Sequence, residues 1–306
     1  MTEATAPRAP INRRALGRAL SRIADATVAE ALAVLESEAG LGREVWRCGI
    51  TGPAGAGKSS LVGRFVNARL AHRRRVGVVA IDPSSPYTQG AILGDRIRID
   101  AHGDDTELFV RSLASRRARD GLADNIANVL ALLEAHDFDD VLIETVGAGQ
   151  SQYEVRELVD TLVVVLMPGA GDMVQAVKAG ILETGDIYVI NKGDRPGAKE
   201  MVAEIASVLR HPATPDDWLP PVVLTSALSG DGVAELDAAA EAHRVWRARH
   251  VATESARRQR RRAHVRALVA RRLAEVIDAG ADTWWDADVA SAYHAVVAGL
   301  DYPAGE

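Results

Sequence analysis

The sequence predicts an α/β protein with a doubly wound, mostly parallel sheet and helical segments at both ends of the chain. Between about residues 44 and 240, short apolar runs typical of strands alternate with stretches of helical periodicity. This rhythm is typical of a parallel sheet that helices cover on both faces. Glycine-rich and polar loops follow these runs, as expected where functional loops gather at the carboxyl ends of strands. The predicted strands are 45–51, 76–81, 141–145, 161–166, 187–190 and 221–225.

The order of these patterns divides the 306 residues into three predicted parts. Residues 12–38 place apolar side chains three to five positions apart, which is typical of a helix, and Gly40 and Gly42 end that segment. We therefore expect an N-terminal helical extension, an α/β domain and a C-terminal helical arm, with the bounds 1–42, 43–240 and 241–306.

The C-terminal arm is expected to begin with one long helix, or two, over residues 241–279. From Ala256 to Arg272 the chain has eight Arg and no acidic residue. Such a helix suits a membrane surface, an acidic partner, or a second copy whose apolar surface the Arg stems cover. No lipidation signal supports the membrane alternative, so we expect no stable membrane insertion, while an acidic partner and a dimerisation helix both stay open. Residues 281–306 predict a short helical end that contains Trp.

Composition narrows the class of protein. A net charge of −6 argues against a general nucleic-acid binder. The single cysteine, Cys48, excludes an internal disulfide and a cysteine-based metal cluster within one chain. The first 40 residues lack the apolar core of a signal peptide, and no apolar run reaches about 18 residues. We therefore expect a soluble, cytoplasmic protein.

The most specific motif is the run Gly-Pro-Ala-Gly-Ala-Gly-Lys-Ser at residues 52–59, which fits G-x-x-x-x-G-K-[ST], the P-loop. It lies between a predicted strand and a predicted helix, where backbone N–H groups can bind phosphate. The glycines allow the tight turn. Lys58 is expected to reach the β- and γ-phosphates of a nucleotide, and Ser59 to bind Mg²⁺. The alternative is a glycine-rich turn that only connects two elements.

A second motif indicates which base the nucleotide carries. Asn191, Lys192 and Asp194 form an N-K-x-D run directly after a predicted strand. The Asp194 carboxylate can accept hydrogen bonds from the N1–H and the exocyclic amine of guanine, whereas adenine would leave it unpaired. Asn191 can connect this loop to the P-loop, and the Lys192 stem can lie along the base. The alternative is a surface turn, but the position after a strand favours GTP over ATP.

A third loop follows the predicted strand 221–225. It consists of Ser226, Ala227 and Leu228. Loops of this kind commonly supply a backbone N–H to the guanine carbonyl, and we expect the same here.

Three carboxylates follow or adjoin predicted strand ends near the expected phosphates: Asp82, Asp95 and Glu144. Mg²⁺ keeps several waters and takes few protein ligands, so we expect them to act partly through coordinated water. Asp95 could instead be a helix cap or a surface ion-pair residue. Glu144 and Gly147 resemble a D-x-x-G switch with Glu in the Asp position, in which a γ-phosphate would order the loop through the Gly147 N–H.

A further loop, at residues 167–173, is rich in small residues and precedes Lys178. Asp172 in this loop is expected either to be part of a mobile switch or to be an ordinary acidic residue at a helix start. Gln150 is a candidate for orienting the attacking water. Because no glutamine is certain in that role, we expect GTP hydrolysis to be slow without a partner.

These segments together resemble one family in order and spacing. The chain contains GPAGAGKSS, IDPSSPYTQGAILGDR, FVRSLASR, IETVGAGQSQYEV, LMPGAGDMVQAVKAGILE, NKGD and SAL. This series is similar to the MeaB/ArgK family of P-loop GTPases, from the signal-recognition and nitrogenase-like branch, over about residues 12–275. The resemblance implies a GTP-hydrolysing metallochaperone that gates adenosylcobalamin loading and protects or reactivates an acyl-CoA mutase. It also implies a homodimer through C-terminal helices.

The resemblance carries roles over by position, with GTP or GDP and Mg²⁺ as the ligands. The residues expected at the phosphates are Gly52, Pro53, Ala54, Gly55, Ala56, Gly57, Lys58, Ser59, Ser60 and Gly147. The residues expected at guanine are Asn191, Lys192, Asp194, Ser226, Ala227 and Leu228. The residues expected around Mg²⁺ are Ser59, Asp82, Asp95 and Glu144. The residues expected to act in hydrolysis or its coupling are Lys58, Glu144, Gln150, Asp172 and Lys178.

Other functions stay open at this point. The same family also carries the description of an ATPase for arginine and ornithine transport. A nickel-delivery GTPase is disfavoured because the chain has one Cys and eight scattered His. A GTP switch without turnover and a nucleotide kinase are further alternatives. The sequence does not name the mutase, which could be the methylmalonyl-CoA type or a relative such as 2-hydroxyisobutyryl-CoA mutase.

Overall fold

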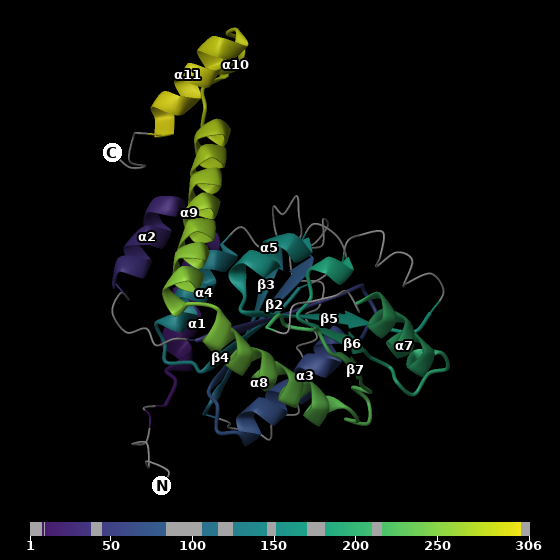
Figure 1. Ribbon diagram of the computed structural model, residues 1–306. Helices are drawn as coiled ribbons and strands as arrows, with labels where there is room; N and C mark the ends of the chain where they lie inside the picture. Colours follow the sequence, from purple (N-terminus) through teal and green to yellow (C-terminus); the bar gives the residue numbers. More distant parts are fainter. Residues whose placement is uncertain are drawn as a thin grey trace.

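The computed structural model describes residues 8, 10–37, 45–83, 106–115, 125–145, 151–169, 181–209 and 216–300. Within these residues, seven strands form one sheet in the order β3-β2-β4-β1-β5-β6-β7 (Figure 1). Each described neighbouring pair is parallel. The strands are β1 (Trp46–Thr51), β2 (Val76–Pro83), β3 (Leu108–Ser115), β4 (Asp140–Glu144), β5 (Thr161–Leu166), β6 (Ile187–Ile190) and β7 (Val222–Leu224). The predicted parallel sheet is confirmed.

Strand β3 was not among the strands that the apolar pattern predicts. Among the described strands it pairs with β2 alone, at one edge of the sheet. Its run is interrupted by Arg111, and Val110 is exposed. An edge strand contacts water along one side, so its sequence lacks the continuous apolar character of a central parallel strand such as β5, in which every residue is buried.

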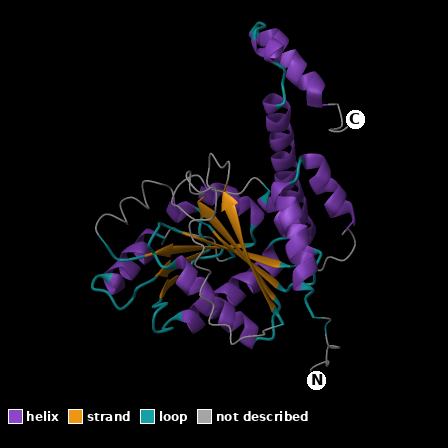
Figure 2. Cartoon of the chain, turned by 180° about the vertical axis from the view of Figure 1, so that it is seen from behind, coloured by secondary structure: helices purple, strands orange, loops and turns teal. Residues whose placement is uncertain are grey.

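Helices cover both faces of the sheet (Figure 2). One hydrophobic cluster joins the sheet to α1 (Arg13–Asp25), α4 (Ile126–Glu134), α5 (Ser151–Leu158) and α7 (Ala198–Val208). The other joins it to α3 (Lys58–Ala71) and α8 (Val233–His250). Alternate residues of β5 enter the two clusters, as the strand period of two requires. The doubly wound architecture is therefore confirmed.

The helical segment predicted at 12–38 is two helices, α1 and α2 (Val28–Ser37). The chain is extended at Ala26 between them. Thr27 and Glu30 then form a capping box: the Thr27 backbone N donates to the Glu30 carboxylate at 2.8 Å, and the Glu30 backbone N donates to the Thr27 hydroxyl at 3.3 Å. This reciprocal pair begins a new helix, so the periodic stretch bends rather than continues.

The C-terminal region contains two long helices where one or two were expected. Helix α8 ends at His250, and α9 (Thr253–Asp278) is followed by α10 (Asp282–Trp285) and α11 (Val289–Leu300). The expected boundary at residue 240 lies inside α8 and stays a prediction. Figure 1 shows α9 extending away from the sheet, with α10 and α11 at its far end and α2 beside it.

Contacts between backbone and side chain hold α9 against α2. Glu275 accepts a hydrogen bond from the Val28 backbone N at 3.0 Å, and Arg271 donates to the Ala26 carbonyl. The N-terminal helices and the arm are therefore joined on one side of the molecule. Of the helices in the described ranges, none combines the length and apolar character needed to cross a bilayer.

Candidate nucleotide-binding site

The predicted P-loop connects β1 to α3 in a backbone conformation that requires glycine. Gly52, Gly55 and Gly57 have φ values of 142°, 79° and 83°, a region that favours glycine. Space is restricted as well. A Cβ at Gly52 would lie 2.0 Å from the Val165 carbonyl oxygen, and one at Gly57 would lie 2.5 Å from Asn191 Nδ2. The loop therefore passes directly against β5 and against the N-K-x-D loop.

Lys58 is the first residue of α3, and its side chain folds back over the P-loop. Its Nζ donates to the carbonyl oxygens of Gly52 and Pro53, both at 2.9 Å. Lys58 as a whole is 6% exposed. Burial lowers the pKa of Lys58, and the nearby Glu144 carboxylate opposes that shift. A buried ammonium with neutral hydrogen-bond acceptors at a helix N-terminus suits the phosphates of a nucleotide, which would supply the missing negative charge.

The two predicted Mg²⁺ ligands that the structure describes are in contact. Ser59 Oγ donates to Glu144 Oε1 at 2.6 Å. Ser59 lies in the first turn of α3, and Glu144 is the last residue of β4, the strand next to β1. A hydroxyl and a carboxylate beside a phosphate loop are the hard oxygen ligands that Mg²⁺ prefers. The residues present therefore fit the ion that the sequence implies.

Asn191 connects the P-loop to the two loops predicted to bind guanine. Its Nδ2 donates to the Ala56 carbonyl at 2.7 Å. Its Oδ1 accepts from the Ala227 backbone N at 3.0 Å and from the Thr225 hydroxyl at 3.2 Å. Because Asn191 is 1% exposed, losing it would leave several of these buried groups unpaired. The predicted connection between the N-K-x-D loop and the P-loop is present in the structure.

The remaining predicted guanine residues lie on the two loops that Asn191 connects. The Ser226 hydroxyl donates to Asp194 Oδ1 at 3.3 Å, and the Gly193 backbone N donates to the Thr225 carbonyl at 2.8 Å. Asp194 itself is exposed, so its carboxylate is accessible to a ligand. Lys192 reaches across to Met167, with 3.2 Å between Nζ and Sδ.

Two residues of this region were not predicted from the sequence. Thr225 donates to Asn191, and Arg64 of α3 donates to the carbonyls of Ala227 and Leu228 at 3.2 and 3.0 Å. Thr225 is the last residue of the predicted strand 221–225, so its place beside a functional loop was a usable signal. Arg64 is an ordinary exposed position of a helix in the sequence, and no local pattern singles it out.

Several predicted site residues lie outside the described part of the chain. Asp82 belongs to β2, next to β4 in the sheet, but only its backbone is described. The others are Asp95, Gly147, Gln150, Asp172 and Lys178. Their roles stay predictions.

The fold and the site together define a class of protein. A P-loop between β1 and α3, a Ser/Glu pair at its base and an N-K-x-D loop bound to it are the parts of a P-loop GTPase. A sequence model of the family described as "Methylmalonyl Co-A mutase-associated GTPase MeaB" matches residues 14–282. The chain belongs to this family, and the predicted resemblance is confirmed. The protein is a GTPase.

Individual relatives agree with this assignment. A putative GTPase of Pyrococcus horikoshii is 37% identical over 241 residues, which are 78% of this chain and 76% of the relative. A mouse protein named "Methylmalonic aciduria type A homolog, mitochondrial" is 35% identical over 195 residues, or 62% of this chain and 47% of the relative.

A solved structure described as "LAO/AO transport system kinase" is similar in fold. Its TM-score is 0.61 and its sequence identity is 24%, and the match covers 88% of this chain and 87% of that one. At this identity the likeness supports the fold alone, so the alternative role in amino-acid transport stays a prediction.

Proposed function

We propose that this chain is a Mg²⁺-dependent GTPase with slow intrinsic turnover that gates adenosylcobalamin loading into a B12-dependent acyl-CoA mutase and protects or reactivates that mutase. The observation that carries the proposal is the family match over residues 14–282, whose description names methylmalonyl-CoA mutase. The name of the mouse relative, which refers to methylmalonic aciduria, points to the same metabolism. The arrangement of the nucleotide site supports the hydrolytic part.

In this proposal, different residues at the carboxyl edge of the sheet contact different parts of GTP. Lys58 balances the charge of the β- and γ-phosphates, and Asn191 holds the P-loop against the guanine loops. Asp194 accepts the two guanine donors, which excludes adenine. Ser59 and Glu144, with Asp82 and Asp95, would hold Mg²⁺, which would supply charge neutralisation at the phosphates. Gln150, Asp172 and Lys178 orient water and couple hydrolysis to the partner.

The dimer is also part of the proposal. Apolar side chains on α9 and α11 are exposed: Val265, Val269 and Leu273 on α9, and Val289 and Tyr293 on α11. Val289 is 87% exposed. These exposed apolar side chains support an interaction site on the arm, and a second copy of the chain would cover it. Size-exclusion chromatography with light scattering tests this, and a monomer at micromolar concentration would contradict it.

The function is tested by measuring GTP hydrolysis by the purified protein, alone and with each candidate mutase. We expect low turnover alone and a higher rate with one mutase that also co-elutes with the protein. A second variant, Asp194→Asn, tests the guanine site: it should bind GTP more weakly and xanthosine triphosphate better than wild type does. GTP hydrolysis that no mutase changes would leave the GTPase assignment standing and reject the mutase role.

A further inference from the structure

Arg64 lies two turns into α3, on the outside of the P-loop helix, and it contacts the loop predicted to bind the guanine carbonyl. Its Nε donates to the Ala227 carbonyl oxygen at 3.2 Å, and its Nη2 donates to the Leu228 carbonyl oxygen at 3.0 Å. The planar guanidinium therefore holds two consecutive peptide units. A lysine ammonium could not match this fork geometry.

These two contacts fix the direction of the next backbone N–H groups. The described peptide bonds are all trans, and in a planar trans peptide the N–H points opposite to the C=O. When Arg64 draws the Ala227 carbonyl toward α3, the Leu228 N–H must point to the other side of the loop. The Leu228 side chain is 84% exposed, so side-chain packing contributes little to holding this segment.

Arg64 also closes a ring of contacts around the site. Asn191 donates to Ala56 in the P-loop and accepts from the Ala227 backbone N. Ala227 in turn accepts from Arg64, whose helix begins at Lys58, directly after the P-loop. The phosphate loop and the guanine loop are thus joined both through Asn191 and through Arg64.

We propose that Arg64 is a positioning residue for guanine recognition: its guanidinium orients the 226–228 loop so that a backbone N–H meets the C6 carbonyl of the base. The inference rests on the proposed function, in which this loop contacts guanine. It assigns Arg64 no contact with the nucleotide. Through the 226–228 loop, Arg64 affects the contact with the base carbonyl, whereas Asp194 contacts the N1–H and the exocyclic amine.

The test is a comparison of Arg64 variants with base analogues on the full-length protein. GDP is compared with 2-aminopurine riboside diphosphate, which lacks the C6 oxygen and therefore also the N1–H, and with IDP, which lacks the exocyclic amine. The missing N1–H affects wild type and the Arg64 variants alike, so the comparison between proteins still isolates the contact with the C6 oxygen. We expect Arg64→Gln to weaken GDP roughly tenfold, the scale of a hydrogen bond to a charged group, and to leave the 2-aminopurine nucleotide nearly unchanged. The preference for GDP over IDP should change by less than about twofold, because Asp194 is a separate contact.

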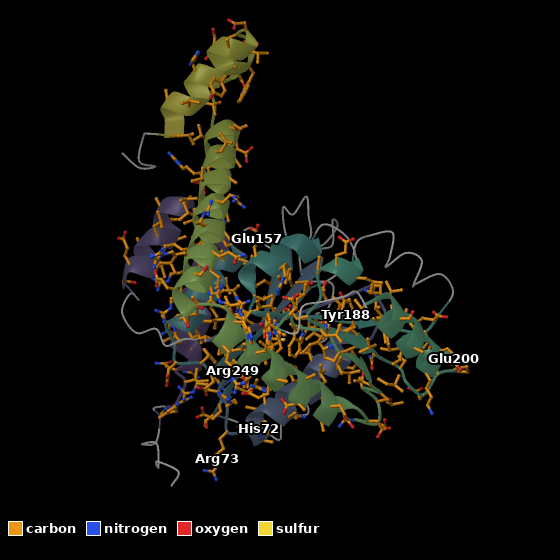
Figure 3. All side chains as sticks on the ribbon, viewed as in Figure 1. His72, Arg73, Glu157, Tyr188, Glu200 and Arg249 are labelled. Carbon is orange, nitrogen blue, oxygen red and sulfur yellow. The ribbon has the colours of Figure 1, made fainter. Side chains whose placement is uncertain are left out.

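Two further variants make the result specific. Arg64→Lys should recover only part of the discrimination, because it can hold one carbonyl but not both. Arg73→Gln removes the same charge from an exposed residue just after α3, whose side chain points away from the sheet in Figure 3, and should behave as wild type. Melting of the nucleotide-free Arg64 variants should stay close to wild type.

Either of two outcomes would overturn the Arg64 proposal while leaving the proposed function intact. Either Arg64→Gln discriminates the C6 oxygen as well as wild type, or it weakens GDP and the 2-aminopurine nucleotide by the same factor. The second result would assign Arg64 a general structural role. A wild-type protein that binds ADP as well as GDP would be a different failure, because it would reject the guanine site itself and the inference with it.

Discussion

The two ends of the parallel sheet are held together in different ways. At the carboxyl end, the nucleotide loops are joined by hydrogen bonds to backbone carbonyls and amides, as in the contacts of Lys58, Asn191 and Arg64. At the amino end, buried aspartates lie at the start of three strands and pair with arginines. Asp140 begins β4, and Asp160 and Asp186 directly precede β5 and β6.

Each of these aspartates receives an arginine from a different element. Asp140 accepts from Arg69 of α3 at 2.7 Å. Asp160 accepts from the Arg47 backbone N and from Arg260 of α9. Asp186 accepts from Arg156 of α5 at 2.6 Å. These pairs, listed from one side of the sheet to the other, are Arg69–Asp140, Arg260–Asp160 and Arg156–Asp186.

The difference indicates what each end does. Charges at the amino end are compensated within the protein, so they support the fold and the attachment of α9. The Lys58 charge at the carboxyl end is bonded to neutral acceptors and suits an external anion. Variants at the amino end should therefore change stability, and variants at the carboxyl end should change turnover.

The largest expected effect is on stability, in Arg69→Met. Arg69 is 1% exposed, lies over the Trp46 ring and also bonds to Asp237. Burial alone would lower the pKa of Arg69, but Asp140 and Asp237 raise it overall. Removing it takes away the closest cation of the fully buried Asp140 carboxylate and leaves it with Arg244 at 3.9 Å, which costs about 3–5 kcal/mol. Urea unfolding should show this loss, while turnover per folded molecule stays at the wild-type value.

The control is Arg73→Met, at an exposed residue just after the same helix, which should change the free energy of unfolding by less than about 0.5 kcal/mol. Adding Asp140→Asn to Arg69→Met should recover part of the loss, because the two side chains form one interaction. If Arg69→Met keeps its stability but loses turnover, the amino end of the sheet would affect catalysis rather than stability, and the distinction between the two ends would be wrong.

The complementary variant is Lys58→Ala. GTP hydrolysis should fall by at least about two to three orders of magnitude, the scale reported for removing a group that stabilises transition-state charge. Melting of the nucleotide-free protein should change little: because burial lowers the Lys58 pKa, the charged side chain carries a desolvation cost that its loss removes. Lys199→Ala, at an exposed position of α7, is the control. Wild-type turnover in Lys58→Ala would reject the P-loop assignment.

The same two ends differ in how far the sequence predicts them. The carboxyl end is encoded in short contiguous motifs: the P-loop occupies residues 52–59, and Asn191 to Asp194 form one run. The doubly wound fold follows from the alternation of apolar runs, and this pattern predicts every strand of the sheet except the polar edge strand β3. The amino end depends on pairs such as Arg69 and Asp140, 71 positions apart, and Arg64 contacts Ala227 over 163 positions. No local pattern contains such pairs.

A smaller effect is expected where the sheet attaches to the arm. Arg260 of α9 donates to both carboxylate oxygens of Asp160 at 2.9 Å. Asp160 keeps the Arg47 backbone N and Arg247 when Arg260 is removed, so Arg260→Ala should cost only about 1–2 kcal/mol. Hydrogen exchange should rise in α9 and stay unchanged in the P-loop helix. Arg261→Ala, at the exposed neighbouring position, should leave the exchange of α9 as it is.

The smallest expected effect is a pH dependence from His243 of α8. Trp46 Nε1 donates to the Thr161 hydroxyl at 3.0 Å, and the same hydroxyl lies 2.8 Å from His243 Nδ1. The other ring nitrogen of His243, Nε2, faces an Asp186 carboxylate oxygen at 3.5 Å. Burial lowers the His243 pKa. Asp186 opposes this shift, whereas Arg156 and Arg247 add to it.

The sign of the effect follows from that lowered pKa. Below about pH 6.5, His243 binds a proton in the unfolded chain but stays unprotonated in the folded protein. The free energy of unfolding should therefore fall as the pH drops from about 6.5 toward the folded pKa. The slope cannot exceed about 1.4 kcal/mol per pH unit for one group. Burial also lowers the pKa of His264 on α9, so it adds a contribution of the same sign. Urea unfolding between pH 7.5 and 5 should give a smaller slope in His243→Gln and the smallest in the double variant with His264→Gln. Equal slopes in all three proteins would mean that His243 and His264 bind protons as easily in the folded protein as in the unfolded chain. The two histidines would then be accessible to solvent rather than part of the buried network.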